Sequence, residues 1–66
     1  MAGYGKAMLI AKSQSKETEE NLMVFFDAEE GNKGYFIKEE DTFYATADDE
    51  QQEIALWYNG EIIQEW

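Results

Sequence analysis

The sequence predicts an all-β protein: a small antiparallel meander of about six short strands that closes into a barrel or sandwich. Short apolar and aromatic segments alternate with glycine, asparagine and acidic clusters, a pattern typical of strands joined by turns. Ten of the 66 residues are aromatic, so the core should be built largely from rings. The pair Asn59-Gly60 favours a type I′ hairpin. We expect residues 1–66 to form a single domain, without disulfides because the chain has no cysteine.

Two apolar segments in the first half of the chain are expected to be strands. Tyr4–Lys12 fits an alternating strand. Ser13–Asn21 is polar and is expected to be a loop. A short helix is the alternative there, because Ser15 precedes acidic residues in a capping-type pattern, but no apolar stripe at helical spacing follows. Leu22–Asp27 is apolar on both sides, which indicates a strand covered on two faces or in contact with another subunit.

Turn-forming residues divide the middle of the chain. Ala28–Gly34 contains residues that tolerate positive φ and should form a turn. Tyr35–Lys38 and Thr42–Ala47 are expected to be the third and fourth strands. At about 3.3 Å per residue, a strand over Thr42–Ala47 would hold the acidic triplets on either side of it about 20 Å apart.

The end of the chain carries the strongest local signal. Glu53–Tyr58 and Glu61–Trp66 flank the Asn59-Gly60 turn and should pair as a hairpin. A regular two-residue loop would place opposite each other Tyr58 and Glu61, Trp57 and Ile62, and Leu56 and Ile63. In this register Glu61 and Glu65 would share a face and stand about 13 Å apart.

Charge is distributed unevenly along the chain. The formal net charge is −10, and residues 1–38 and 39–66 contribute −1 and −9 because all five lysines precede residue 39. Self-repulsion of this size makes folding more costly, whereas a net charge of about 2–8 is enough to keep a small domain soluble. We therefore expect the negative field to serve binding. The candidate partner-binding residues are Glu39, Glu40, Asp41, Asp48, Asp49, Glu50, Glu53, Glu61 and Glu65.

Catalysis, cofactors and metals are not expected. The chain lacks histidine and cysteine, so the commonest general base and the thiolate ligands are missing. Its acidic residues fall in turns and at strand ends, where solvent keeps carboxylates ionised and prevents the raised pKa of a catalytic acid. Asp48, Asp49, Glu50 and Glu53 could hold a weak cation, but solvated acidic turns are the preferred interpretation.

Membranes and nucleic acids are also unfavourable partners. The longest apolar segments, Ala7–Ala11 and Leu22–Phe26, are too short to cross a bilayer. No secretory signal is recognisable at the N-terminus, so a cytoplasmic protein is expected. Direct binding to DNA or RNA requires lysine and arginine to neutralise phosphates, and an acidic chain opposes it.

The charge surface suggests imitation of nucleic acid. Duplex DNA carries one charge for about every 1.7 Å of its axis, so nine carboxylates match about 15 Å of duplex. In size, aromatic β-rich composition, net negative charge and the acidic runs 39–41 and 48–50, the chain resembles the small acidic DNA-mimic inhibitors that phages use in host takeover. Known targets of that group include nucleoid proteins, uracil-DNA glycosylase, restriction enzymes, CRISPR effectors and RNA polymerase.

The resemblance implies a non-enzymatic protein, with a homodimer possible, that binds a basic DNA-binding protein and blocks its DNA site. That partner would be a nucleoid protein, a DNA-processing enzyme or a defence effector. Plainer alternatives are acid-rich loops on an ordinary small domain, or adaptation to high salt, which does not explain why the lysines stop at Lys38. A further alternative is a small β-barrel adaptor or accessory subunit that docks through an apolar surface while its acids maintain solubility.

Overall fold

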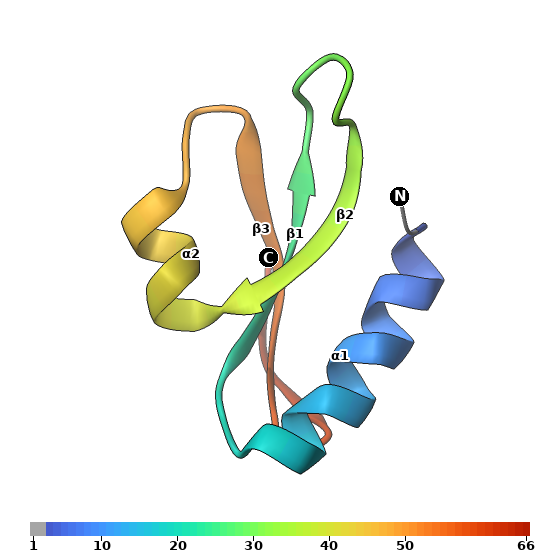
Figure 1. Cartoon of the computed structure of the whole chain (residues 1–66). Helices are drawn as coiled ribbons and strands as arrows, with labels where there is room; N and C mark the ends of the chain where they lie inside the picture. Colours follow the sequence, from blue (N-terminus) through green and yellow to red (C-terminus); the bar gives the residue numbers. More distant parts are fainter. Residues whose placement is uncertain (1–2) are drawn as a thin grey trace.

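A four-stranded antiparallel sheet carries one helix on each face (Figure 1). The computed structural model describes residues 3–66. Within the sheet the strand order is β2-β1-β3-β4, so β1 and β3 are central and β2 and β4 are the edges. In chain order the elements are α1 (Tyr4–Thr18), β1 (Leu22–Asp27), β2 (Gly34–Glu39), α2 (Glu40–Thr46), β3 (Gln51–Tyr58) and β4 (Glu61–Glu65).

Strand β1 lies at the centre of the fold and is covered on both sides. It pairs with β2 along one edge and β3 along the other, and five of its six residues are buried. Its side chains alternate between the faces: Val24 belongs to the core under α1, while Met23 and Phe25 belong to the core under α2. The predicted strand over Leu22–Asp27 and its covering on two faces are therefore confirmed.

Helix α1 packs on the sheet through small side chains. Ala7 and Ala11 are 1% and 0% exposed and contact Val24, Ala55 and Trp57. Because alanine lacks a bulky side chain, the helix backbone can come close to the sheet. The core on this face is therefore thin, and partly buried residues of β2 and β3 complete it.

Helix α2 covers the opposite face with a single aromatic anchor. Phe43 is 2% exposed, and its ring centroid lies 4.8 Å from that of Phe25, which in turn packs on Phe36 at 5.9 Å. Met23 and Leu56 complete this core. The aromatic core expected from composition is present under α2 as Phe25, Phe36 and Phe43, and Trp57 and Tyr35 contribute rings on the α1 side.

The strand predicted over Tyr4–Lys12 is wrong, because these residues form most of α1. The loop predicted over Ser13–Asn21 is also wrong for its larger part, since the helix continues to Thr18. Ala7, Ala11 and Ser15 recur every four residues and form the buried stripe of the helix. Such a stripe of small residues is easily overlooked beside the alternating large residues that suggested a strand, one of which, Leu9, is 70% exposed.

The fourth strand predicted over Thr42–Ala47 is wrong as well, because Glu40–Thr46 is the helix α2. The all-β barrel or sandwich is corrected accordingly: the sheet is antiparallel and small, as predicted, but it has four strands and two open edges. The predicted third strand, Tyr35–Lys38, is confirmed within β2. Since a helix rises only about 1.5 Å per residue, α2 holds the two acidic triplets about 10 Å apart along its axis rather than about 20 Å.

The C-terminal hairpin is confirmed, with one correction to its register. Asn59 and Gly60 have φ values of 51° and 81°, as a type I′ turn requires. Tyr58 pairs with Glu61 and Trp57 with Ile62, as predicted, but Leu56 pairs with Gln64 instead of Ile63. A bulge at Ile63 causes this shift. Because β4 has one extra residue there, the side chains after Ile63 point to the face opposite to the one that a regular strand would give them. Glu61 and Glu65 therefore point to opposite faces, and the prediction that they share one is wrong.

A buried serine joins the first helix to the last hairpin. Ser15 is fully buried; its Oγ accepts a hydrogen bond of 2.9 Å from the backbone N–H of Gly60 and donates one of 3.1 Å to the carbonyl oxygen of Lys12. The hydroxyl thus satisfies a buried backbone donor in the turn, 45 residues along the chain.

Replacing Ser15 with alanine should lower the free energy of unfolding by about 1–3 kcal/mol, because the N–H of Gly60 would remain buried without an acceptor. Ser13→Ala is the matched control, since Ser13 is exposed on the same helix. Urea denaturation followed by circular dichroism measures both. Equal midpoints for the two variants would contradict a structural role for the Ser15 hydroxyl.

Candidate acidic interaction surface

Four carboxylates gather where β2 passes into α2. Glu39 ends the strand, Glu40 and Asp41 begin the helix, and Glu20 comes from the connection between α1 and β1. Asn21 holds the group together, because its Nδ2 donates to Oε1 of Glu40 at 3.0 Å and its carbonyl oxygen accepts from the N–H of Glu40 at 2.9 Å. We call Glu20, Glu39, Glu40 and Asp41 the lower acidic cluster; with Asn21 they line an open hollow.

Repulsion within this cluster affects the protonation of Glu39. The charge of Glu20 raises the pKa of Glu39 above its ordinary value of 4.5, with smaller contributions from desolvation, from a hydrogen bond with Glu20 and from the charge of Asp41. A carboxyl group that is harder to ionise after folding shows that these charges are held closer together than in the unfolded chain.

A second group of acids lies at the other end of α2. Asp48, Asp49 and Glu50 form the connection to β3, where Oδ1 of Asp48 accepts from the N–H of Glu50 at 2.9 Å. The carbonyl oxygen of Glu50 accepts from the N–H of Ala28 at 2.9 Å, so this connection lies against the turn between β1 and β2. That turn contributes two further exposed acids. We call Glu29, Glu30, Asp48, Asp49 and Glu50 the upper acidic cluster.

Asp27 anchors the upper acidic cluster from below. It is 1% exposed, and its carboxylate accepts hydrogen bonds from the N–H of Glu29 at 2.9 Å, from Asn32 Nδ2 at 3.3 Å and from Gln51 Nε2 at 3.1 Å. The bond from the Glu29 backbone, followed by that from Gln51, lowers the pKa of Asp27 below its ordinary value of 3.8. Its charge is therefore used to hold the turn and β3 together.

Tyr44 and Glu53 lie between the two clusters. The Tyr44 hydroxyl donates a hydrogen bond of 2.6 Å to Oε2 of Glu53. That bond, followed by desolvation and by the charges of Glu53 and Glu40, raises the pKa of Tyr44 to about 12. Tyr44 is bonded to Glu53 of β3 and lies close enough to Glu40 for that charge to affect its pKa, so it lies between β3 and the lower acidic cluster.

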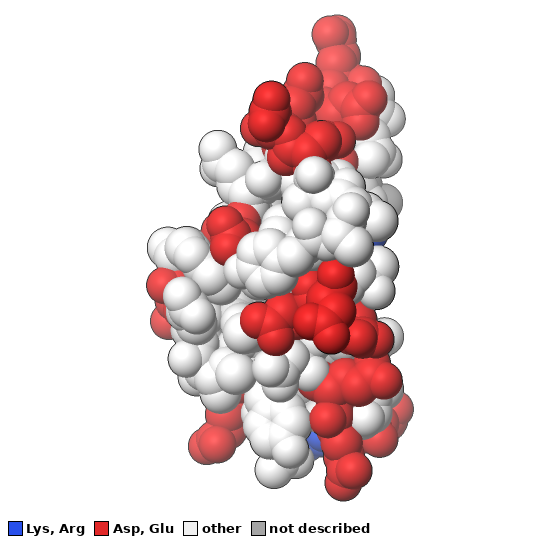
Figure 2. Space-filling view, turned by 90° about the vertical axis from the view of Figure 1, so that its left-hand side faces the viewer, with Lys and Arg blue, Asp and Glu red and all other residues white. Residues whose placement is uncertain are grey.

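Figure 2 shows the α2 side of the molecule, with carboxylates at its top, in its middle and toward its lower right. An uncharged band separates the upper group from the middle one, so the acidic surface is one face with an interruption. Very little lysine surface is visible from this side.

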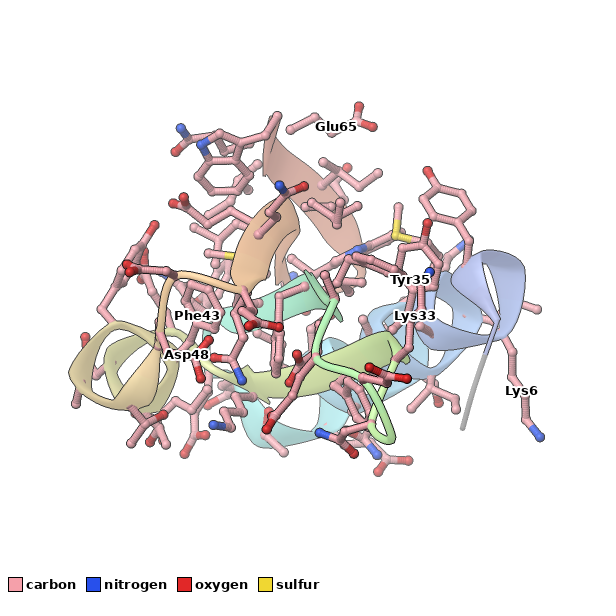
Figure 3. All side chains as sticks on the ribbon, turned by 90° about the horizontal axis from the view of Figure 1, so that it is seen from above. Lys6, Lys33, Tyr35, Phe43, Asp48 and Glu65 are labelled. Atoms are coloured by element: carbon pink, nitrogen blue, oxygen red, sulfur yellow. The ribbon has the colours of Figure 1, made fainter. Side chains whose placement is uncertain are left out.

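Three of the five lysines lie on α1, on the other face of the sheet. Lys6, Lys12 and Lys16 are exposed there. In Figure 3 Lys6 extends outward from α1, Asp48 lies beside α2 on the opposite side, and Glu65 lies away from both at the β4 edge. Most of the lysines and most of the candidate acids therefore lie on opposite faces of the sheet, although Lys38 lies on the α2 face, where its Nζ donates to Oγ1 of Thr46.

The structure brings most of the sequence-predicted residues together. Seven of the nine lie within α2 or directly beside it: Glu39, Glu40, Asp41, Asp48, Asp49, Glu50 and Glu53. The other two, Glu61 and Glu65, belong to the edge strand β4 and do not join either cluster. Sequence reasoning missed Glu20, Glu29 and Glu30, which flank β1; the pairing of β1 with both neighbours brings its two ends next to the acidic segments.

Within residues 3–66, no group of three or more acidic side chains has an arrangement that could hold a metal ion. No helix in this part of the chain has both the length and the apolar character needed to cross a bilayer. No family model, curated protein or solved structure matches the chain. Its function must therefore be inferred from the geometry and charge of its own surface.

Glu39→Gln should stabilise the protein at neutral pH. Since the pKa of Glu39 is raised by folding, its ionisation disfavours the folded state increasingly as the pH rises above 4.5 and through the raised value. Well below pH 4.5 Glu39 is protonated in both states, so the variant should match the parent there. Urea midpoints across this range measure the effect, and Glu17→Gln on α1 is the control. A variant that is no more stable at neutral pH would contradict the repulsion between Glu20 and Glu39.

Proposed function

We propose that this protein binds a basic nucleic-acid-binding protein without catalysis and occludes its DNA site. The carboxylates of the α2 side would occupy the positions of DNA phosphates. The observation that carries the proposal is the gathering of acids on this side from four separate segments of the chain, while three lysines lie on the helix across the sheet.

The amount of charge fits a partial imitation of duplex DNA. The molecule measures 32 Å along its longest axis, a length over which a duplex carries about nineteen phosphate charges. The two clusters and Glu53 supply ten carboxylates, roughly half of that number. In a DNA-binding protein whose lysines and arginines are spaced for phosphates, about every second one would therefore face a carboxylate of this protein.

Binding would come from many modest contacts acting together. Exposed ion pairs contribute about 0.2–1 kcal/mol each, so no single carboxylate should dominate. Their combined field also steers a basic partner and accelerates association at low salt. Tyr44, which is 52% exposed between the clusters, adds an aromatic surface that excludes water from neighbouring pairs.

A second candidate is the adaptor or accessory subunit, which docks through an apolar surface. The exposed apolar side chains of the C-terminal hairpin favour it: Ile63 and Trp66 are 53% and 50% exposed. In that case the acids keep an otherwise apolar protein soluble, and binding does not depend on the clusters around α2.

Capture of partners from a cell lysate at two ionic strengths distinguishes the two functions. If the acidic surface imitates DNA, DNA-binding proteins should be retained at low salt, released at about 0.15 M because exposed charges are screened beyond about 8 Å, and displaced by added duplex DNA. One salt-resistant partner that duplex DNA does not displace would contradict mimicry and support the adaptor.

Paired variants test whether the position of the charge matters. Glu39→Gln with Asp41→Asn should weaken capture of the DNA-displaceable proteins by about two- to thirtyfold, as expected for the loss of two exposed ion pairs. Glu40 is left unchanged because it bonds to Asn21. Glu17→Gln with Glu19→Gln removes the same charge near the end of α1 and should weaken capture less. An equal loss from both pairs would show that only net charge acts.

A further inference from the structure

We infer that the outer edge of β4 accepts an extended basic strand from the partner protein, which adds to the sheet as a fifth, antiparallel strand. The inference rests on the proposed function for the basic character of the partner. It adds a second contact surface, on a different side of the molecule from the acidic clusters.

The two edges of the sheet differ in how well they are covered. Four of the six residues of β2 are partly buried and one is fully buried. All five residues of β4 are exposed, and among the described residues only β3 pairs with it. An edge strand presents unpaired N–H and C=O groups that can pair with another chain, and such strand addition is a common mode of peptide recognition.

The exposed side chains of this edge are apolar in the middle and acidic on either side. Ile62 and Ile63 are 38% and 53% exposed, between Glu61 and Glu65. The edge extends to Trp66, because its N–H donates to the carbonyl oxygen of Ile54 at 3.1 Å and keeps the chain beside β3. Edge strands in soluble proteins are protected by lysine, proline, other charges, bulges or short length; β4 has no lysine or proline, and its protection is limited to its short length, its bulge and its glutamates.

Charge favours a basic partner strand over a second copy of this chain as the occupant of the β4 edge. Pairing the β4 strands of two copies would bring Glu61 and Glu65 of both copies to one seam, where like charges repel. Each copy also carries a net charge of −10. A strand with lysine or arginine at the opposing positions gains two cross-strand pairs instead.

The bulge at Ile63 determines where those basic residues should stand. It turns Glu61 to the α2 face and Glu65 to the α1 face. In β3, the residues opposite these two glutamates, Tyr58 and Ala55, are three positions apart. A partner strand that pairs in the same way would therefore place basic residues three positions apart, one on each face.

A synthetic peptide tests the inference without any DNA-binding protein. The probe is the acetylated and amidated peptide Thr-Val-Thr-Lys-Thr-Val-Lys-Val-Thr, titrated into the full chain while the amide resonances of β4 and Trp66 fluorescence are followed. The matched control peptide has the same sequence with alternate backbone amides methylated, so that it keeps its charge but loses its donors along one edge. We expect shifts centred on β4, and binding weakened at least tenfold by methylation.

The glutamates are tested by substitution. Glu61→Gln with Glu65→Gln should weaken peptide binding by about two- to thirtyfold, the contribution of two opposite-charge cross-strand pairs. Glu17→Gln with Glu19→Gln removes the same charge elsewhere and should leave binding unchanged. All four side chains are exposed, so the fold should tolerate the changes.

Equal binding of the methylated and unmethylated peptides, or resonance shifts centred on α2, would overturn strand addition. So would a dimer in sedimentation that Ile63→Lys abolishes, because the edge would then belong to a second copy. If the peptide does not bind while DNA-displaceable proteins are still captured, strand addition at β4 is contradicted and the proposed function is not. If the peptide binds β4 but no DNA-binding protein is captured, the proposed function falls and strand addition stands.

Discussion

Burial of β1 on both faces is the constraint on which the rest of this small structure depends. A strand with apolar side chains on both sides needs cover above and below, and a chain of 66 residues has little material to provide it. Two helices supply that cover in different ways. Helix α1 uses small side chains that let the backbone come close, whereas α2 uses one large ring, Phe43, stacked on Phe25.

The position of the charges follows from this arrangement. Because β1 pairs antiparallel with β2 and β3, its two ends lie beside segments that come much later in the chain. Glu20 thereby meets Glu39, and the backbone of Ala28 meets that of Glu50. Acids that the sequence places in separate turns become neighbours around α2. This crowding raises the pKa of Glu39, because the charge of Glu20 lies close to it.

The two helices that cover β1 leave β4 uncovered. Both helices pack over the strands nearer β1, and the turn that precedes β4 is joined to α1 by the buried bond between Ser15 and Gly60. Its apolar side chains therefore face solvent at an open edge. The acidic α2 side and the β4 edge give the molecule two chemically different surfaces, one suited to side-chain charge and the other to backbone pairing.

Local patterns in the sequence determined the elements whose signals are short-range. The two-faced strand at Leu22–Asp27 and the Asn59-Gly60 turn were predictable because apolar runs and positive-φ residues act over a few positions. Most candidate acidic residues were also identified, although their grouping was not. Tertiary structure alone decided that Tyr4–Thr18 is helical, because Ala7, Ala11 and Ser15 form a meaningful stripe only against a sheet that accepts small side chains. It also decided the bulge at Ile63 and the meeting of Glu20 with Glu39, because both depend on pairing between strands and not on neighbours in the chain.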